Sequence, residues 1–325
     1  MWTTRLALVG ALTLAALFLA PVAGGQAPTG VQRIGILAFG AKPDEGVQVF
    51  LDQLHKLGYI ERRDIVIEDR YAEGQPERLP DLAAELVRLK VDLIVALGTD
   101  VTVSVKNATT EIPVVFLASG DPIGVGLVRN LARPGGNVTG ITLLASELSG
   151  KRLELIKEIR NRISRVGVLW NPDHLDYDFA AIQASARKLG VRLQPLEVRQ
   201  SSDFEKAFKT AIDSKIEALV VVPTRLTYVH RQQIADFGLA DRIPTVSGWS
   251  EFADAGGLLT YGPNLNERIR RAAVYADKIL KGTKPGDLPV EQPTTFELVV
   301  NQKTARMIGV AIPAPILSRA DRVIR

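Results

Sequence analysis

Short polar residues and glycines gather where the apolar runs of this sequence end. Thr99 and Ser119 each follow such a run and precede a predicted helix, where free backbone N–H groups and the helix dipole favour an anion such as a carboxylate. Asp121 has the opposite charge and suits an ammonium group. Together these residues would hold a zwitterion, for instance an amino acid. The same residue types are favoured as helix N-caps, and the two roles are compatible.

Aromatic and charged residues at other strand ends would complete such a site. Phe39, Trp170, Trp249 and Tyr261 would form walls for an apolar or aromatic group, although aromatic residues near strand ends are often part of a core. Glu251 either pairs with a ligand cation or lies on a solvated helix start. The other polar residues at strand ends are Asn171 and Thr224.

Patterns for catalysis and metal binding are absent from the sequence. The stretch ASELSGKR at 145–152 fails the phosphate-binding loop pattern at both ends. The stretch GWSEF at 248–252 has Phe252 where a hydrolase elbow needs glycine. The three histidines lie far apart, and the chain has no cysteine. We therefore expect no enzyme activity, no metal and no cofactor.

Alternating apolar and amphipathic segments must position these residues. The runs at 33–39, 91–99 and 112–121 are rich in Val, Ile and Leu, which is typical of parallel strands buried on both faces. The same alternation of strands and helices begins again with the strand at 165–171. Later in this half, a single helix is predicted over 229–242. The sequence therefore predicts an α/β protein with two doubly wound parallel-sheet lobes. Ligands of such sheets bind beyond the carboxyl ends of the strands.

The stretch ARPGGNVTG at 132–140 separates the two halves. Its glycines allow the chain to turn, and Pro134 restricts the backbone. This stretch therefore predicts a hinge between lobes that close on a ligand. A rigid loop is the alternative. The tail is too short for a third domain and must cross back, so we expect a hinge of several strands. The predicted lobes are 31–140 plus 263–290, and 141–262 plus 291–325.

The first 25 residues differ from the rest. A basic start, the apolar run LALVGALTLAALFLA and a small-residue exit are typical of a cleavable signal peptide over 1–25. A membrane anchor is the alternative, although a spanning helix needs about 20 apolar residues. Because cysteine is absent, the chain cannot carry a lipid on an N-terminal cysteine. We expect a soluble, exported protein of the periplasm that is not lipid-anchored.

The composition is that of an ordinary globular protein. The 325 residues are enough for two domains, and 46% are hydrophobic. The formal net charge is +4, from 40 basic and 36 acidic residues that are interspersed along the chain. Interspersed charge does not form a basic patch, so we expect no nucleic-acid partner.

Several long segments resemble one protein family. The most specific are IPVVFLASGDPIGVGLVRNLARPGGNVTGIT at 112–142 and RRAAVYADKILKGTKPGDLPVEQPTTFELVVN at 270–301. With these segments and VGVLWNP at 166–172, the chain resembles the ABC-transporter substrate-binding family of the tryptophan/tyrosine-binding type, within the type I periplasmic binding fold.

The resemblance implies that hinge closure captures a small ligand in a cleft between the lobes, along loops with Thr99, Ser119–Asp121, Asn171, Thr224 and Trp249. Its partners would be an ABC permease and its ATPase in the inner membrane. Our leading hypothesis is the periplasmic binding component of an importer for a small polar solute, favouring an amino acid with an aromatic or apolar side chain. A sensory module that presents its liganded form to a membrane receptor is the second hypothesis, and a secreted two-lobe enzyme is the third.

Overall fold

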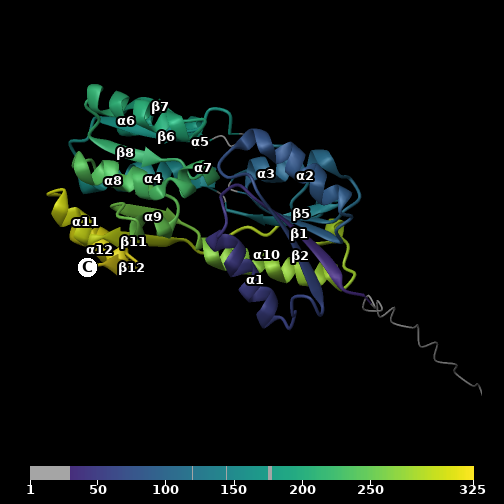
Figure 1. Ribbon diagram of the computed structural model, residues 1–325. Helices are drawn as coiled ribbons and strands as arrows, with labels where there is room; N and C mark the ends of the chain where they lie inside the picture. Colours follow the sequence, from purple (N-terminus) through teal and green to yellow (C-terminus); the bar gives the residue numbers. More distant parts are fainter. Residues whose placement is uncertain (1–29, 119, 144, 175–177) are drawn as a thin grey trace, which may run out of the picture.

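Strands and helices alternate along the chain and form two sheets, each with helices packed on it (Figure 1). The computed structural model describes residues 30–118, 120–143, 145–174 and 178–325. The predicted signal peptide and Ser119 lie outside these residues. Within the described part of the chain, no helix has the length and apolar character needed to cross a membrane.

The first sheet is parallel throughout, in the order β2-β1-β3-β4-β5. Its strands are β1 (Gln32–Ala38), β2 (Ile65–Tyr71), β3 (Leu93–Leu97), β4 (Val114–Ala118) and β5 (Val138–Thr142). Its helices are α1 (Glu45–Lys56), α2 (Leu79–Arg88), α3 (Thr99–Ala108) and, from later in the chain, α10 (Leu265–Leu280), with the 3-10 turns η1 (Pro76–Arg78) and η3 (Pro285–Asp287). Helix α1 packs against α10 and α2 against α3, so both faces are covered and β3, β4 and β5 are buried throughout (Figure 1).

The second sheet has the order β12-β11-β10-β9-β8-β6-β7. Its strands are β6 (Arg165–Trp170), β7 (Arg192–Glu197), β8 (Ala218–Val221), β9 (Thr245–Ser247), β10 (Leu259–Gly262), β11 (Glu297–Asn301) and β12 (Arg322–Ile324). Its helices are α4 (Ala145–Ile159), α5 (Asp178–Leu189), α6 (Phe204–Asp213), α7 (Arg225–Val229), α8 (Arg231–Ala240), α9 (Ser250–Asp254), α11 (Gln302–Met307) and α12 (Ala314–Arg319), with the 3-10 turn η2 (Ser201–Asp203). Strand β10 leads into the first lobe and β11 returns from it, so these two neighbours are antiparallel.

The chain crosses between the lobes after β5, after β10 and before β11. Two of these crossings are bonded to each other, because Thr142 N donates to Glu291 O and Glu291 N donates to Gly140 O, each at 2.9 Å. Arg271 Nη2 lies 2.7 Å from the Glu291 carboxylate and holds the returning segment on α10. The predicted fold of two doubly wound lobes with a multi-strand hinge is therefore confirmed. The residue boundaries of the lobes stay a prediction.

The glycine-rich stretch at 132–140 does not itself form a crossing. Gly135 and Gly136 have φ values of +67° and +68° and precede β5, whereas the crossing follows the other end of that strand. A Cβ built on Gly286 would lie 3.1 Å from Gly135 Cα, so this turn packs against the connection after α10. The positive φ values explain the glycines, and the chain bends between the lobes beyond β5.

The helix predicted over 229–242 is divided into α7 and α8. Thr224 caps α7 four residues earlier than predicted, because its Oγ1 accepts a hydrogen bond from Thr227 N at 3.2 Å. His230 ends α7 with φ −96° and ψ 13°, outside the helical range, and α8 begins at the next residue. The earlier start places Arg225 and Tyr228 on a short helix of their own.

Gly140 is expected to reject a side chain. A Cβ built on it would lie 2.2 Å from Phe116 O and 2.6 Å from Phe116 N, which are backbone atoms inside the sheet. Gly140→Ala should therefore lower the free energy of unfolding by about 1–3 kcal/mol, measured as a lower melting temperature. Gly30→Ala is the control, since a Cβ there meets nothing within 4 Å. Equal melting temperatures for the two variants would contradict the close contact.

Candidate functional site

The carboxyl ends of the two sheets face each other. The strand order reverses between β1 and β3 in the first sheet and between β6 and β8 in the second, and parallel sheets bind ligands at such switch points. Contacts join the segments that follow these strands: Arg225 bonds to Asp44, and His174 Nε2 lies 3.9 Å from Asp100 Oδ2. The two switch points therefore form one candidate site between the lobes.

Asp44 and Arg225 form the most buried ion pair across the lobes. Arg225 Nη2 donates to Asp44 Oδ2 at 3.0 Å, and the two side chains are 13% and 6% exposed. Asp44 is also the N-cap of α1, where its Oδ1 accepts hydrogen bonds from the Gly46 and Val47 amides at 2.9 and 3.2 Å. One carboxylate thus fixes the start of α1 and reaches the second lobe.

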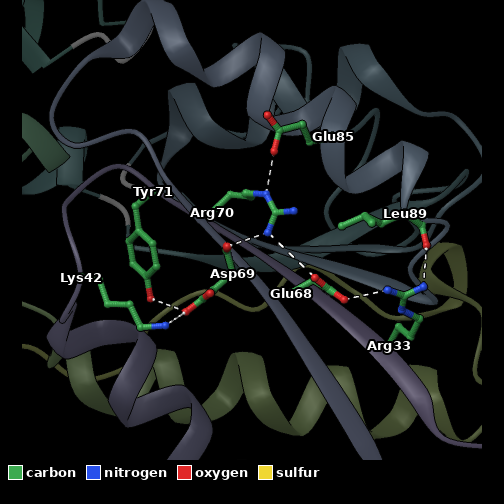
Figure 2. Close-up of polar contacts among 8 residues, drawn as sticks. All are labelled: Arg33, Lys42, Glu68, Asp69, Arg70, Tyr71, Glu85 and Leu89. Atoms are coloured by element: carbon green, nitrogen blue, oxygen red, sulfur yellow. Dashed lines mark hydrogen bonds and ion pairs between the residues drawn. The ribbon is translucent and has the colours of Figure 1, made fainter.

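Charged residues of β2 hold the loop that carries Asp44. Lys42 Nζ lies 2.6 Å from Asp69 Oδ2, which also accepts a hydrogen bond from the Tyr71 hydroxyl at 3.1 Å (Figure 2). Figure 2 shows the network continuing along the sheet through Arg33–Glu68 and Arg70–Glu85. Because β2 is an edge strand, these charges also discourage pairing with another chain.

Tyr228 lies at the centre of a second interlobe contact. Its hydroxyl donates to Glu45 Oε2 at 3.0 Å, and Arg231 Nη2 donates to both oxygens of the same carboxylate at 2.8 and 2.9 Å. Arg225 and Arg231 lie over the Tyr228 ring, 4.9 and 4.5 Å from its centroid, and Trp249 packs edge-on at 4.9 Å. Burial raises the pKa of Tyr228, so the hydroxyl stays a donor.

Several residues predicted from strand ends lie near this contact. Thr99 is the first residue of α3, and a Cβ on the preceding Gly98 would lie only 2.8 Å from Arg225 Cγ. Thr224 precedes Arg225 directly and caps its helix. Trp249 is buried against Tyr228, and Phe39 belongs to a buried cluster that continues into the second lobe. Their contact with a ligand stays a prediction.

Glu251 lines a groove between the lobes. The groove has a volume of about 370 Å³ and contains Glu45 from the first lobe with Arg231, Glu251 and Asp254 from the second. Burial raises the pKa of Glu251, the carboxylates of Asp254 and Glu45 raise it further, and Arg231 opposes them. Glu251 therefore lies beside the interlobe contact, among the charges of Glu45, Asp254, Arg231 and Arg322.

Other predicted residues have local partners in loops. Asp121 is exposed, and its Oδ1 accepts a hydrogen bond from Ile123 N at 2.9 Å, as in a turn after β4. Asn171 Oδ1 accepts from Asp173 N at 2.9 Å in the loop that leads to His174. The Tyr261 ring packs 6.1 Å from the Phe296 ring in the second lobe. Ser119 lies outside the described residues.

The contact between His174 and Asp100 adds a titratable pair to the interface. The His174 side chain is almost fully buried. Burial raises the pKa of Asp100, His174 lowers it, and Asp173 raises it. Among the described residues, no group of three or more His, Asp or Glu side chains could hold a metal ion.

The sequence reasoning missed Asp44, Arg225 and Tyr228. Asp44 could have been found as the N-cap of the helix that follows the first strand, since aspartate is a favoured N-cap residue. Arg225 and Tyr228 were missed because the helix after β8 was predicted to begin at residue 229. Asp44 and Arg225 are 181 residues apart in the sequence, so their pairing leaves no local sequence pattern.

A family model for ABC transporter substrate binding proteins matches residues 34–324. The chain belongs to this family. A tyrosine-binding protein of Clostridioides difficile (strain R20291) is 26% identical over 267 residues, which is 82% of this chain and 76% of that protein. The present substrate-binding protein thus shares the type I periplasmic binding fold predicted from its sequence.

Two solved structures of the fold differ in how closely they match. A domain from Streptococcus pneumoniae in complex with L-Trp is 26% identical, covers 91% of this chain and 100% of that one, and has a TM-score of 0.83. The ligand-free, open structure of a substrate binding protein with adhesive properties from Clostridium difficile is also 26% identical, covers 90% and 99%, and has a TM-score of 0.63. In this substrate-binding protein, the ion pairs of Arg225 with Asp44 and of Arg231 with Glu45 join the two lobes, and we call this arrangement closed.

Glu45→Gln is expected to favour the open arrangement. The substitution weakens the bonds that Tyr228 and Arg231 donate across the lobes. Because Glu45 is 62% exposed, we expect a shift of only about two- to fivefold in the equilibrium between open and closed forms. Small-angle X-ray scattering should show a larger radius of gyration than for wild type, with the difference reduced at high salt. Glu77→Gln, on an exposed turn, is the control, and identical radii for both variants would contradict the role of Glu45.

Glu251→Gln is expected to stabilise the protein at neutral pH. The raised pKa means that the ionised carboxylate destabilises the fold above its ordinary pKa of 4.5, whereas the protonated form carries no such penalty below it. The melting temperature at pH 7.5 should rise by roughly 2 °C, and the gain should vanish as the pH falls toward 4.5. Glu205→Gln, on the exposed side of α6, should show no such trend. A gain that is constant with pH would exclude this cause.

Proposed function

We propose that this chain is the solute-binding component of an ABC importer and that its ligand is an amino acid with an aromatic or apolar side chain. The observation that carries the proposal is the interlobe contact, where charged groups of both signs and aromatic rings meet at two facing switch points. The names of its relatives support the ligand class, since one is a tyrosine-binding protein and another holds L-Trp.

In this proposal, ligand capture and lobe closure are one equilibrium. A ligand that contacts both lobes favours the closed form by the difference between its affinities for the two forms. The lobes would be 31–140 plus 263–290 and 141–262 plus 291–325, with bending at the crossings after β5, after β10 and before β11. The helix start at Thr99 would face the ligand's polar end, and Phe39 and Trp249 its side chain.

Export and the membrane partners follow from the same proposal. The predicted signal peptide at 1–25 would direct the chain to the periplasm, where the closed form would dock on a permease coupled to an ATPase. Uptake of labelled L-tryptophan by cells that lack this gene should then fall. A sensory role would leave uptake unchanged.

A thermal-shift screen of the refolded, ligand-stripped protein tests the ligand class. At about 100 times its Kd, a ligand adds roughly 2.7 kcal/mol to the free energy of unfolding, which should raise the melting temperature by several degrees. We expect shifts with L-tryptophan, L-tyrosine or L-phenylalanine, smaller shifts with L-leucine, and none with L-glutamate, L-lysine or ribose. The absence of a shift with every aromatic amino acid would overturn the proposed ligand.

A further inference from the structure

Arg225 is the arginine of the interface whose hydrogen bonding is incomplete. Its guanidinium donates through Nη2 to Asp44, and its stem lies so close to Gly98 that a Cβ there would be 2.8 Å from Arg225 Cγ. The Tyr228 ring covers one face of the group at 4.9 Å. The Nε atom is buried and has no hydrogen-bond partner among the described residues. A permanently charged group with five donors thus keeps an unused donor inside the interface.

The neighbouring protein groups are already engaged. Asp44 Oδ1 accepts from the two amides at the start of α1, so only Oδ2 is available to Arg225. The Tyr228 hydroxyl donates to Glu45 rather than accepting from Arg225. A buried donor without an acceptor costs free energy, and a guanidinium is best satisfied by two acceptor oxygens in its plane. Arg225 Nε therefore lacks an acceptor, and an anionic oxygen would be the strongest one.

Arg231 lies in the same interlobe contact, and its hydrogen bonding is more complete than that of Arg225. Its Nη2 donates to both oxygens of Glu45, and its Nη1 donates to Tyr228 O at 3.1 Å. It is also more exposed than Arg225, 24% against 13%. Two arginines therefore bridge the lobes, but the protein itself satisfies Arg231 more fully.

Trp170 and Arg268 are among the other residues with a buried donor that has no partner in the described part of the chain. Trp170 stacks on Phe179 at 4.4 Å in the second lobe. Arg268 pairs with Glu267 and Glu291 beside the crossing before β11. Arg225 combines such a donor with a bond from one lobe to the facing switch point of the other.

We propose that Arg225 binds the carboxylate of the ligand through Nε, while Asp44 acts as a positioning residue that holds the guanidinium in place. The inference rests on the proposed function and deepens it, because it makes the carboxylate a requirement for recognition. The ligand class becomes α-amino acids, as opposed to amines with the same side chain. No bond is made or broken, so the step is recognition alone.

Calorimetric titration with L-tryptophan and with tryptamine, which lacks the carboxylate, tests the inference. Wild type should bind L-tryptophan roughly 10- to 100-fold more tightly than tryptamine, as expected for a charged hydrogen bond. Arg225→Gln should remove most of this preference. Arg231→Gln is the matched control: it weakens closure, so both ligands should lose affinity by a similar factor and the preference should remain. Asp44→Asn should also keep the preference.

The outcomes separate the inference from the proposed function. If wild type binds neither compound nor any other aromatic amino acid, the proposed ligand fails. If wild type prefers L-tryptophan and Arg225→Gln keeps that preference, the carboxylate is bound elsewhere and this inference is overturned. Circular dichroism checks that each variant is folded.

A measurement on wild-type protein covers the case in which Arg225→Gln does not fold. The Nε–H resonance of Arg225, assigned by its loss in Arg225→Lys, should shift and exchange more slowly with water when L-tryptophan binds. Tryptamine should leave it unchanged. An equal response to both compounds would overturn the inference.

Discussion

One aspartate connects the helix start in the first lobe to the contact with the second lobe. Asp44 orders the first turn of α1 with one carboxylate oxygen and reaches Arg225 of the other lobe with the second. Burying such a pair costs solvation free energy that largely cancels the charge attraction, so the pair specifies the geometry of closure more than it stabilises it. In the proposed function this balance suits a protein that opens again, because a ligand shifts an equilibrium only by the difference between its affinities for the two states.

The crossings restrict how the lobes move. Because Ile141 and Glu291 pair as neighbouring backbone segments, the crossings after β5 and before β11 are bonded to each other. Arg271 and Arg268 hold Glu291 from α10, so the returning segment is tied to the first lobe up to that residue. A single flexible linker would allow the lobes to rotate freely, whereas bonded crossings favour one closing motion that returns Arg225 to Asp44.

The fold was predictable from the sequence because its signals are local. Buried parallel strands require continuous Val, Ile and Leu, and the helices between them require a 3.6-residue period. The strand-end rule also found Thr99, Thr224 and Trp249, which lie near the interface. It could not rank them against Asp121, since a residue that closes a turn has the same local pattern as one that faces a ligand. Arg225 was not predicted as a site residue, because the predicted helix began at residue 229, after the capping residue Thr224.

Electrostatics around the groove oppose closure as well as favour it. Closing brings Glu45 beside Arg231, but it also brings that carboxylate toward Glu251 and Asp254, which line the same groove. Burial is the largest cause of the raised pKa of Glu251, and the Glu45 carboxylate contributes less to it than Asp254 does. The repulsion between Glu45 and Glu251 therefore offsets a small part of the attraction between Glu45 and Arg231. If protein groups alone held the lobes together, the closed form would be stable without a ligand. Because some of the charges repel one another, we propose that the ligand bound at Arg225 supplies part of the free energy of closure.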